Sequence, residues 1–266
     1  MSGAIELGWG QLGIAAALVL VVGTLSVLMQ LGIGKRMFIA SVRAIVQLTL
    51  LGAVLAPLFR SGPAWVVGLA CLAMIGLAAH EAVRRTSRYY RGARRDAFLS
   101  LAIAGGSTAL LATAVIVRVD PWWEPRYLIP LLGMILGNGL TGISLGLDRC
   151  LQSLDEGRVR LEALLVMGAT PREASRPVAQ AALRSGLVPI LNAMSVVGLV
   201  TVPGMMTGQI LGGTEPVQAA RYQIMVLFLI AAATALGTAG VVLLALRAMF
   251  DGEGRLRPER LKRRKL

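Results

Sequence analysis

Long uncharged apolar runs limit the folds open to this chain more than any other feature of its sequence. The first run extends from Leu7 to Gly34 without a single Asp, Glu, Lys or Arg, and about 18 apolar residues suffice for a helix to cross a bilayer. With a mean hydropathy of +0.70 and 56% hydrophobic residues, the chain lacks the polar surface that a soluble domain needs. The sequence therefore predicts an all-α, polytopic bundle of transmembrane helices.

About seven membrane spans are expected within a single transmembrane domain, residues 1–266. The first has no Lys or Arg before it and is too long for the core of a signal peptide, which favours a retained helix. The seven are Leu12–Leu31, Met37–Leu58, Ala64–Ala82, Ala97–Val117, Tyr127–Leu147, Gly186–Gly208 and Tyr222–Leu246.

The distribution of Lys and Arg predicts how these spans are oriented. The connections on one side carry 22 of these residues, whereas the connections on the other side carry only four, Arg60, Arg118, Arg126 and Arg221. Because basic connections stay in the cytoplasm, we expect the N-terminus outside and the C-terminus inside, in a multi-pass protein of the inner (plasma) membrane. The basic tail, residues 251–266, is expected to be a solvated, disordered cytoplasmic end, with contact to lipid headgroups as a further option.

Charge and cysteine content exclude two further classes of function. The net charge of +13 fits anionic lipid headgroups and cytoplasmic loops better than nucleic acid, because the basic residues gather between apolar runs. The basic loop Ser87–Arg95 is interpreted as a determinant of topology and headgroup contact. The two cysteines, Cys71 and Cys150, lie far apart without CxxC or Cys/His spacing, so neither a disulfide framework nor a zinc site is expected.

The largest predicted cytoplasmic loop, residues 148–185, interrupts the apolar runs with a charged, helical pattern. Leu161, Leu164 and Leu165 share one helical face with Gly168. A glycine suits the left-handed conformation that commonly follows the end of a helix. The pattern therefore predicts a short amphipathic helix that ends at Gly168.

Three residues then predict the start of a second helix. Thr170 is expected at the N-cap, Pro171 at the first helical position, and Glu173 as the residue that reaches back in a capping box. The helix, turn and helix have three interpretations: an amphipathic connector on the headgroups, a DNA-binding helix-turn-helix, or a docking helix for a cytoplasmic partner. A loop tethered between two spans is poorly presented to a DNA groove.

Two sequence patterns favour the docking helix. Glu162-Ala163-Leu164, followed after three residues by Gly168, resembles the E-A-A-x-x-x-G start of the coupling loop in ABC importer permeases. By order and spacing, four longer blocks resemble the FetB-type (UPF0014) family of iron-export ABC permeases, which includes plant permeases linked to aluminium tolerance. These blocks are LLGMILGNGLTGISLGLDR from Leu131, RLEALLVMGATPREA from Arg160, ALRSGLVPILNAMSVVGLVTVPGMMTGQILGG from Ala182 and EPVQAARYQI from Glu215.

The resemblance implies a membrane permease subunit that forms a homodimer and exports iron or another metal ion. It also implies a separate ABC ATP-binding subunit that holds ATP and Mg, so that this chain needs no cofactor and is not itself an enzyme. None of the three lysines lies in the G-x-x-x-x-G-K-[ST] pattern of a phosphate-binding loop. Residues 148–185 would form the coupling loop, with ATPase-coupling residues Glu162, Ala163, Leu165, Gly168, Thr170, Pro171 and Glu173.

Polar side chains within the spans are candidates for a translocation pathway, because unpaired polar groups in hydrocarbon are costly. For Arg43 and Gln47, one turn apart in the second span, snorkelling to the inner interface is an equal alternative. For Asn138 and Thr141 in the fifth span, helix packing or a dimer seam is the alternative. Five more residues lie near an expected helix break at Pro203-Gly204 in the sixth span: Asn192, Ser195, Met205, Met206 and Gln209.

His80 and Glu81, side by side at the end of the third span, are candidate metal ligands, with an interfacial hydrogen-bonding role as the alternative. Two other functions stay open on the sequence alone. One is a stand-alone secondary transporter or channel that couples to an ion gradient through Arg43 and the broken sixth span. The other is a membrane scaffold that transports nothing.

Overall fold

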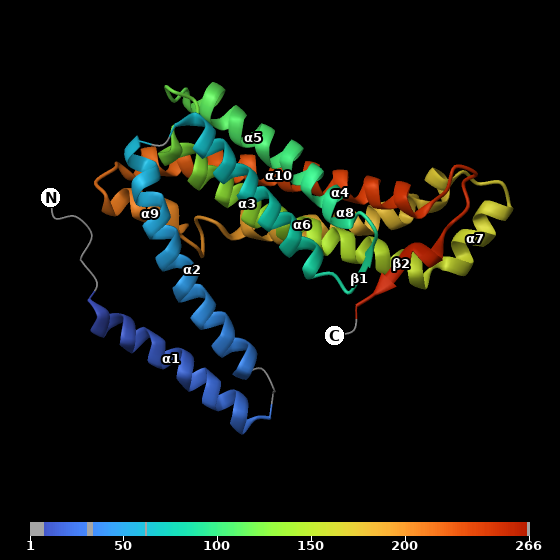
Figure 1. Ribbon diagram of the computed structural model, residues 1–266, viewed down its shortest axis with the longest axis horizontal. Coiled ribbons are helices and arrows are strands. Elements are labelled where there is room, and N and C mark those ends of the chain that lie inside the picture. Colours follow the sequence, from blue (N-terminus) through green and yellow to red (C-terminus); the bar gives the residue numbers. More distant parts are fainter. Residues whose placement is uncertain (1–7, 31–33, 62, 265–266) are drawn as a thin grey trace. The chain divides into compact units, whose positions relative to one another are not determined.

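The computed structural model describes residues 8–30, 34–61 and 63–264, and helices dominate it (Figure 1). The chain divides into two compact units, residues 1–62 with 208–215 and residues 63–207 with 216–266. The first unit contains α1 (Trp9–Leu28) and α2 (Gly34–Ser61), which contact each other. Most described side chains of α1 and α2 are exposed and apolar. This composition is expected for helices that face the hydrocarbon of a membrane.

Among the described residues, five helices are long and apolar enough to cross a membrane, and each contains one of the predicted spans. They are Met37–Phe59, Ala64–Arg84, Ala93–Val117, Pro125–Glu156 and Pro216–Met249. The prediction of an all-α, multi-pass membrane protein is therefore confirmed. The predicted first span corresponds to α1, whose apolar part, Gly10–Ser26, is shorter than these five, and Leu31 at its end lies outside the described residues. The total of seven spans and the side of each terminus remain predictions.

The predicted sixth span, Gly186–Gly208, is not one continuous helix. α8 (Pro171–Val196) stops where Val197 adopts an extended conformation with ψ of 134°, and Gly198 follows with φ of +81°. α9 (Gly204–Leu211) begins only after Pro203. The predicted break at Pro203-Gly204 is therefore present, and it begins about two helical turns earlier, at Val197. Pro203 precedes the new helix, where no backbone N–H is required of it.

The second unit is a bundle of long helices that run beside one another (Figure 1). α6 contacts α3, α8 and α10, while α4 contacts both α3 and α10. The fourth span changes winding along its length, since two π-helical stretches, η1 and η2, flank the single turn α5. The bounds are α3 Ala64–Arg84, α4 Ala93–Leu101, η1 Ala102–Gly106, α5 Ser107–Leu110, η2 Leu111–Val117, α6 Pro125–Glu156, α7 Arg158–Val166 and α10 Pro216–Met249.

Small residues let α6, α8 and α10 approach closely. A Cβ on Gly186 of α8 would lie 2.6 Å from the carbonyl oxygen of Gly142 in α6 and 2.6 Å from Cγ2 of Thr238 in α10. A Cβ on Gly146, one turn further along α6, would lie 2.6 Å from the same methyl group. Gly142 and Gly146 thus form a GxxxG face, opposed in α8 by the equivalent pair of Ala182 and Gly186. These five residues are called the glycine seam below.

The basic tail is folded, contrary to the expectation of a disordered end. After α10 the chain turns at Asp251, passes through the short 3₁₀ turn η3 (Pro258–Arg260) and forms strand β2 (Leu261–Arg263). β2 pairs antiparallel with β1 (Arg88–Tyr90), in the loop between α3 and α4. The prediction failed because the strand partner lies more than 160 residues away in sequence.

Substitution of Gly186 by Ala should separate the three helices of the glycine seam. The added methyl group has no flexible neighbour to displace, since it would meet a backbone oxygen. We expect Gly186→Ala to lower the free energy of unfolding by about 2 kcal/mol, measured as a lower thermal midpoint of the purified protein. The matched control is Gly68→Ala on the exposed side of α3, where a Cβ meets nothing within 4 Å. It should be neutral or slightly stabilising, and equal effects of the two changes would contradict the seam.

Candidate functional site

α7 ends in the way that the sequence predicts. Gly168 has φ of +94°, and its N–H donates to the carbonyl oxygen of Leu165 at 3.0 Å. The N–H of Ala169 donates to the carbonyl oxygen of Leu164, also at 3.0 Å. These two bonds form a Schellman motif, which satisfies carbonyl groups at the end of the helix and fixes the direction in which the chain leaves it.

α8 begins with the predicted capping box. The backbone N–H of Thr170 donates to Oε2 of Glu173 at 2.8 Å, and the N–H of Glu173 donates to Oγ1 of Thr170 at 3.3 Å. The bond from the backbone of Thr170, together with its hydroxyl, lowers the pKa of the Glu173 carboxyl. Pro171 occupies the first helical turn. The turn between α7 and α8 is therefore fixed by hydrogen bonds on both sides.

α7 holds an apolar surface away from the rest of the bundle. Leu161 is only 4% exposed and attaches the helix, whereas Val166 is 88% exposed and Met167 is 74% exposed. Beside them, Nε of Arg158 pairs with the carboxylate of Glu162 at 2.8 Å. Two exposed apolar side chains beside an ion pair, outside the membrane-crossing helices, are typical of a protein contact surface.

The length of α6 separates α7 from the hydrocarbon. The apolar part of α6 ends at Leu147, and the helix continues to Glu156 before α7 begins. At 1.5 Å per residue these nine residues extend about 14 Å, which exceeds the roughly 5–8 Å of a headgroup layer. This length separates α7 from the apolar part of α6 and leaves open both the docking helix and the connector on the headgroups.

Two cavities flank the turn between α7 and α8. One, of about 500 Å³, lies between α7 and the tail, and its walls include Glu162, Val166 and Leu256. The other, of about 790 Å³, lies between the first turns of α8 and the end of α10, and Arg172, Arg176 and Arg247 line it. The tail is therefore part of the surface around the predicted coupling loop.

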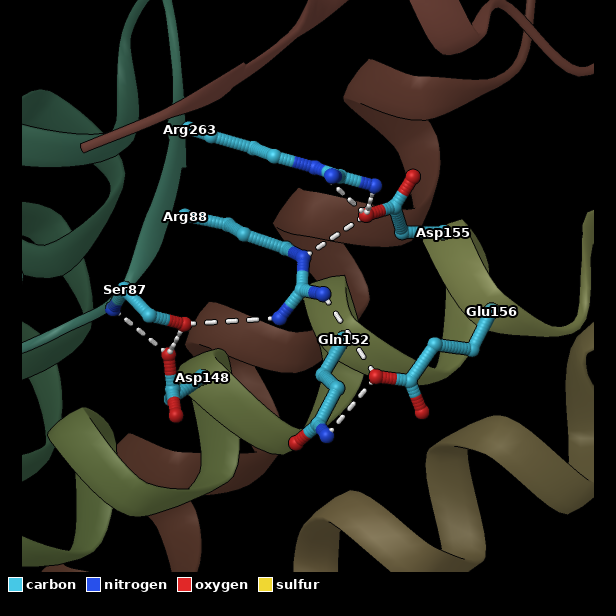
Figure 2. A network of polar contacts seen from close by, with 7 residues as sticks. All are labelled: Ser87, Arg88, Asp148, Gln152, Asp155, Glu156 and Arg263. Atoms are coloured by element: carbon cyan, nitrogen blue, oxygen red, sulfur yellow. Dashed lines mark hydrogen bonds and ion pairs between the residues drawn. The ribbon is translucent and has the colours of Figure 1, made fainter. Parts of the chain in front are cut away.

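The tail is held in place by a carboxylate that the sequence analysis did not single out. In the β1–β2 pair, Arg88 lies directly opposite Arg263, and like charges in this position repel. Oδ2 of Asp155, at the end of α6, accepts bonds from Nε of Arg88 at 2.8 Å and from Nη2 of Arg263 at 2.8 Å (Figure 2). The carboxylate thereby turns a repulsive pair into a three-residue ion network. We call Arg88, Asp155 and Arg263 the tail clamp.

Further polar contacts surround the tail clamp. Figure 2 shows that the hydroxyl and backbone N–H of Ser87 both donate to Oδ1 of Asp148, each at 2.7 Å. Gln152 and Arg88 both donate to Oε1 of Glu156, at 2.9 Å and 3.4 Å. At the start of the tail, the N–H of Arg255 and the guanidinium of Arg257 bond to Asp251 and lower the pKa of its carboxyl. No local sequence pattern marks Asp148 and Asp155, because these carboxylates meet Ser87, Arg88 and Arg263 only after the chain has folded back.

Three of the six predicted pathway residues in the second unit donate a hydrogen bond to their own helix. Nδ2 of Asn138 donates to the carbonyl of Met134 at 3.0 Å, and Oγ1 of Thr141 donates to Gly137 at 3.2 Å. Oγ of Ser195 donates to the carbonyl of Leu191 at 2.9 Å. Asn192 is exposed on α8, and Met205 and Met206 are half-buried on α9. The structure places Asn138 and Thr141 on the outward side of α6, where they remain candidates for a pathway or for helix packing.

Three predicted pathway residues belong to the first unit. Arg43 and Gln47 are both exposed on α2, and Gln209 is half-buried on α9. The amide oxygen of Gln209 is buried without a hydrogen-bond partner among the residues that the structure describes. Arg43 and Gln47 thus share an outward face of α2, and their roles stay predictions.

The predicted metal ligands at the end of α3 differ in their surroundings. His80 is exposed, whereas the carboxylate of Glu81 lies 3.7 Å from Arg84 and 3.5 Å from Arg85. Within residues 8–30, 34–61 and 63–264, no group of three or more His, Cys, Asp or Glu side chains is placed to hold a metal ion. Glu81 is therefore engaged by two arginines, and a metal site at His80 and Glu81 stays a prediction.

Known proteins with sequences similar to this chain belong to one family. The model of an uncharacterised protein family, UPF0014, matches residues 9–250. The UPF0014 membrane protein slr1647 of Synechocystis is 37% identical over 93% of this chain and 95% of its own length. The "Probable iron export permease protein FetB" of Escherichia coli is 31% identical over 96% of each chain. The protein ALUMINUM SENSITIVE 3 of Arabidopsis thaliana is 33% identical, covering 85% of this chain and 82% of its own length. No solved structure matches the chain significantly.

Removal of the Asp155 charge should release the tail. In Asp155→Asn the two arginines of the tail clamp face each other without a carboxylate, and the charge-assisted bonds that hold β2 weaken. We expect roughly tenfold faster hydrogen exchange for the amides of residues 261–264, because such bonds contribute about 1.5 kcal/mol or more. The neighbouring Glu156→Gln, which loses a charge that faces Arg88 and Gln152 but leaves Asp155 in place, should change exchange much less. Wild-type exchange in Asp155→Asn would contradict the clamp.

Proposed function

The chain belongs to the UPF0014 family of membrane proteins, and on that basis we propose that it is the membrane-spanning permease subunit of an ABC transporter that exports a metal ion. The observation that carries the proposal is α7. It follows the nine residues, about 14 Å of helix, by which α6 continues past its apolar part. It presents the exposed Val166 and Met167 and is fixed by a Schellman motif and followed by a capping box. A fixed apolar projection of this kind suits the groove of a protein partner.

The proposed partner is an ABC ATP-binding subunit. The sequence supports a separate source of energy, because its only lysines, Lys35, Lys262 and Lys265, lie outside any phosphate-binding loop pattern. ATP and Mg would be held by that subunit. The three arginines around the cavity beside the turn, Arg172, Arg176 and Arg247, offer sites for acidic side chains of the partner.

The proposed mechanism transmits motion of the ATPase along two helices. Closure of the ATPase pair would push α7 and the turn up to Glu173. α6 leads directly into α7, and α8 leads directly out of the turn. Both helices meet α10 at the glycine seam, where close packing would transmit a displacement of one helix to the others. Alternating access of the pathway to the two sides of the membrane would follow.

Iron is the proposed substrate because one relative, the Escherichia coli protein, carries a name that describes iron export. His80 and Glu81 are the proposed hard-metal ligands of this chain. Methionine sulfur favours soft ions, so Met205 and Met206 support iron less well than they support a packing role. Other metal ions fit the same proposal.

A homodimer is proposed on the outward face of α6. Gly133 and Gly137 form a second GxxxG pair. A Cβ on Gly137 would meet nothing within 4 Å, whereas a Cβ on Gly133 would lie 3.4 Å from Cε of Met74 in α3. Asn138 and Thr141 lie beside this pair. Small residues flanked by amide and hydroxyl groups are typical of contacts between transmembrane helices.

Replacement of Val166 by Asp should abolish docking of the ATPase while the permease still folds, because Val166 is 88% exposed. We expect the amount of P-loop ATPase that co-purifies from native membranes to fall at least about tenfold, and ATP-dependent export of iron to fall with it. Val217→Asp is the matched control, since Val217 is also exposed but lies in the first turn of α10 rather than on α7. Unchanged co-purification and export in Val166→Asp would contradict the docking role. Metal transport by the purified chain under an ion gradient without ATP would instead establish the stand-alone transporter.

Introduction of a bulky side chain at Gly137 should weaken the proposed dimer. In Gly137→Leu the two copies of α6 could no longer approach closely, so we expect a lower dimer fraction in cross-linking of the detergent-solubilised protein. Gly76→Leu on α3, where a Cβ also meets nothing within 4 Å, is the control and should leave the dimer intact. A dimer fraction unchanged by Gly137→Leu would place the contact elsewhere.

A further inference from the structure

A basic cavity that the proposed function does not use lies where the tail meets the loop between α3 and α4. Its volume is about 470 Å³. β1 and β2 form one side of it, so it exists only because the tail strand pairs with the loop strand. The lining residues are Val83, Tyr89, Tyr90, Gly92, Ala93, Arg94, Arg263 and Arg264.

The charges around this cavity are unbalanced. Three of its eight lining residues are arginines, and none is acidic. Arg263 shares Asp155 with Arg88, so this single carboxylate already faces two guanidinium groups. Among the described residues, neither Arg94 nor Arg264 forms an ion pair with a carboxylate. The fold therefore gathers positive charge around a hollow without supplying an anion to match it.

The one carboxylate near Arg94 in sequence is engaged elsewhere. Oδ2 of Asp96 accepts a bond of 2.6 Å from the hydroxyl of Tyr90, and Oδ1 of Asp96 lies 3.3 Å from Nε of Arg95. Asp96 is itself buried. Its carboxylate does not line the cavity, and the net charge of the lining stays positive.

The geometry of Arg264 and of the start of α4 suits a phosphate group. The guanidinium of Arg264 lies 5.6 Å from the centre of the Tyr89 ring and donates to the carbonyl oxygen of Arg84. A guanidinium oriented in this way can still present N–H groups to a phosphate. Gly92 is the N-cap of α4, with φ of +106° and no side chain to bond the first N–H groups of the helix. These N–H groups adjoin the cavity and add a partial positive charge.

The height of the cavity in the membrane indicates the source of the phosphate. The spans that flank it are Ala64–Arg84 and Ala93–Val117, so residues 85–92 lie at the surface of the bilayer whichever way the chain is oriented. Lipid phosphates lie at this level, and arginines there attract anionic lipids. We propose that the cavity binds the phosphate group of an anionic phospholipid, and that the bound lipid holds β2 against β1. This proposal does not depend on the function proposed above.

The test uses the full chain in nanodiscs of phosphatidylcholine with increasing shares of phosphatidylglycerol. Retention of phosphatidylglycerol by the released protein is measured by native mass spectrometry, and the thermal midpoint is measured in parallel. The cavity variant is Arg94→Gln with Arg264→Gln. The matched control is Arg91→Gln with Arg149→Gln, which removes the same charge from exposed arginines that do not line the cavity.

We expect wild-type protein to retain phosphatidylglycerol in preference to phosphatidylcholine and to gain thermal stability with it. Its apparent affinity for phosphatidylglycerol should fall roughly 30-fold in the cavity variant and change little in the control variant. An equal loss in both variants, or no preference of the wild-type protein for phosphatidylglycerol, overturns the proposal. Equal stabilisation by inorganic phosphate in pure phosphatidylcholine discs assigns the cavity to a free anion and overturns the lipid site. The wild-type measurement decides the question even if a variant fails to fold.

Discussion

The close approach of α6, α8 and α10 at the glycine seam is the constraint on which the rest of the second unit depends. In hydrocarbon, no hydrophobic driving force joins one apolar helix to another, so contact must come from packing at short range. Gly142, Gly146 and Gly186 remove the side chains that would keep the helices apart, and Thr238 fills the remaining space. Because α6 and α8 also carry the segment around α7, this seam determines where the predicted coupling helix is held.

Electrostatics organise the basic end of the same unit. β1 and β2 bring arginines into direct opposition, and Asp155 makes that pairing favourable. The result is a folded tail that borders both the turn after α7 and a second, basic cavity. The arginines at this end of the unit therefore fall into two groups. Some are neutralised by carboxylates within the chain, and others are left facing a hollow at the level of the lipid phosphates.

Apolar exposure has a different meaning in the two regions of this protein. Along the spans, exposed Leu, Val and Ile face lipid and carry no information about partners. Beyond the ends of the spans the same exposure is costly, since water is the solvent there. Val166 and Met167 are informative for this reason, because both are exposed and lie outside the five membrane-crossing helices. The predicted pathway residues lack such a contrast, and three of the nine donate a hydrogen bond to their own helix.

The sequence alone determined the elements whose physics is local. Apolar runs of sufficient length specified five spans, since a helix in a bilayer satisfies its own backbone. Gly168, Thr170 and Glu173 specified the turn between α7 and α8, because caps form between neighbours in the chain. Only the tertiary structure decided the features that join distant residues: the pairing of the tail with β1, the role of Asp155 and the meeting of Gly142 with Gly186. It also extended the predicted break of the sixth span back to Val197, because the conformations of Val197 and Gly198 end α8 before Pro203 is reached. Contacts between residues far apart in the chain produce no periodic pattern in the sequence. They could therefore be identified only from the packed helices of the tertiary structure.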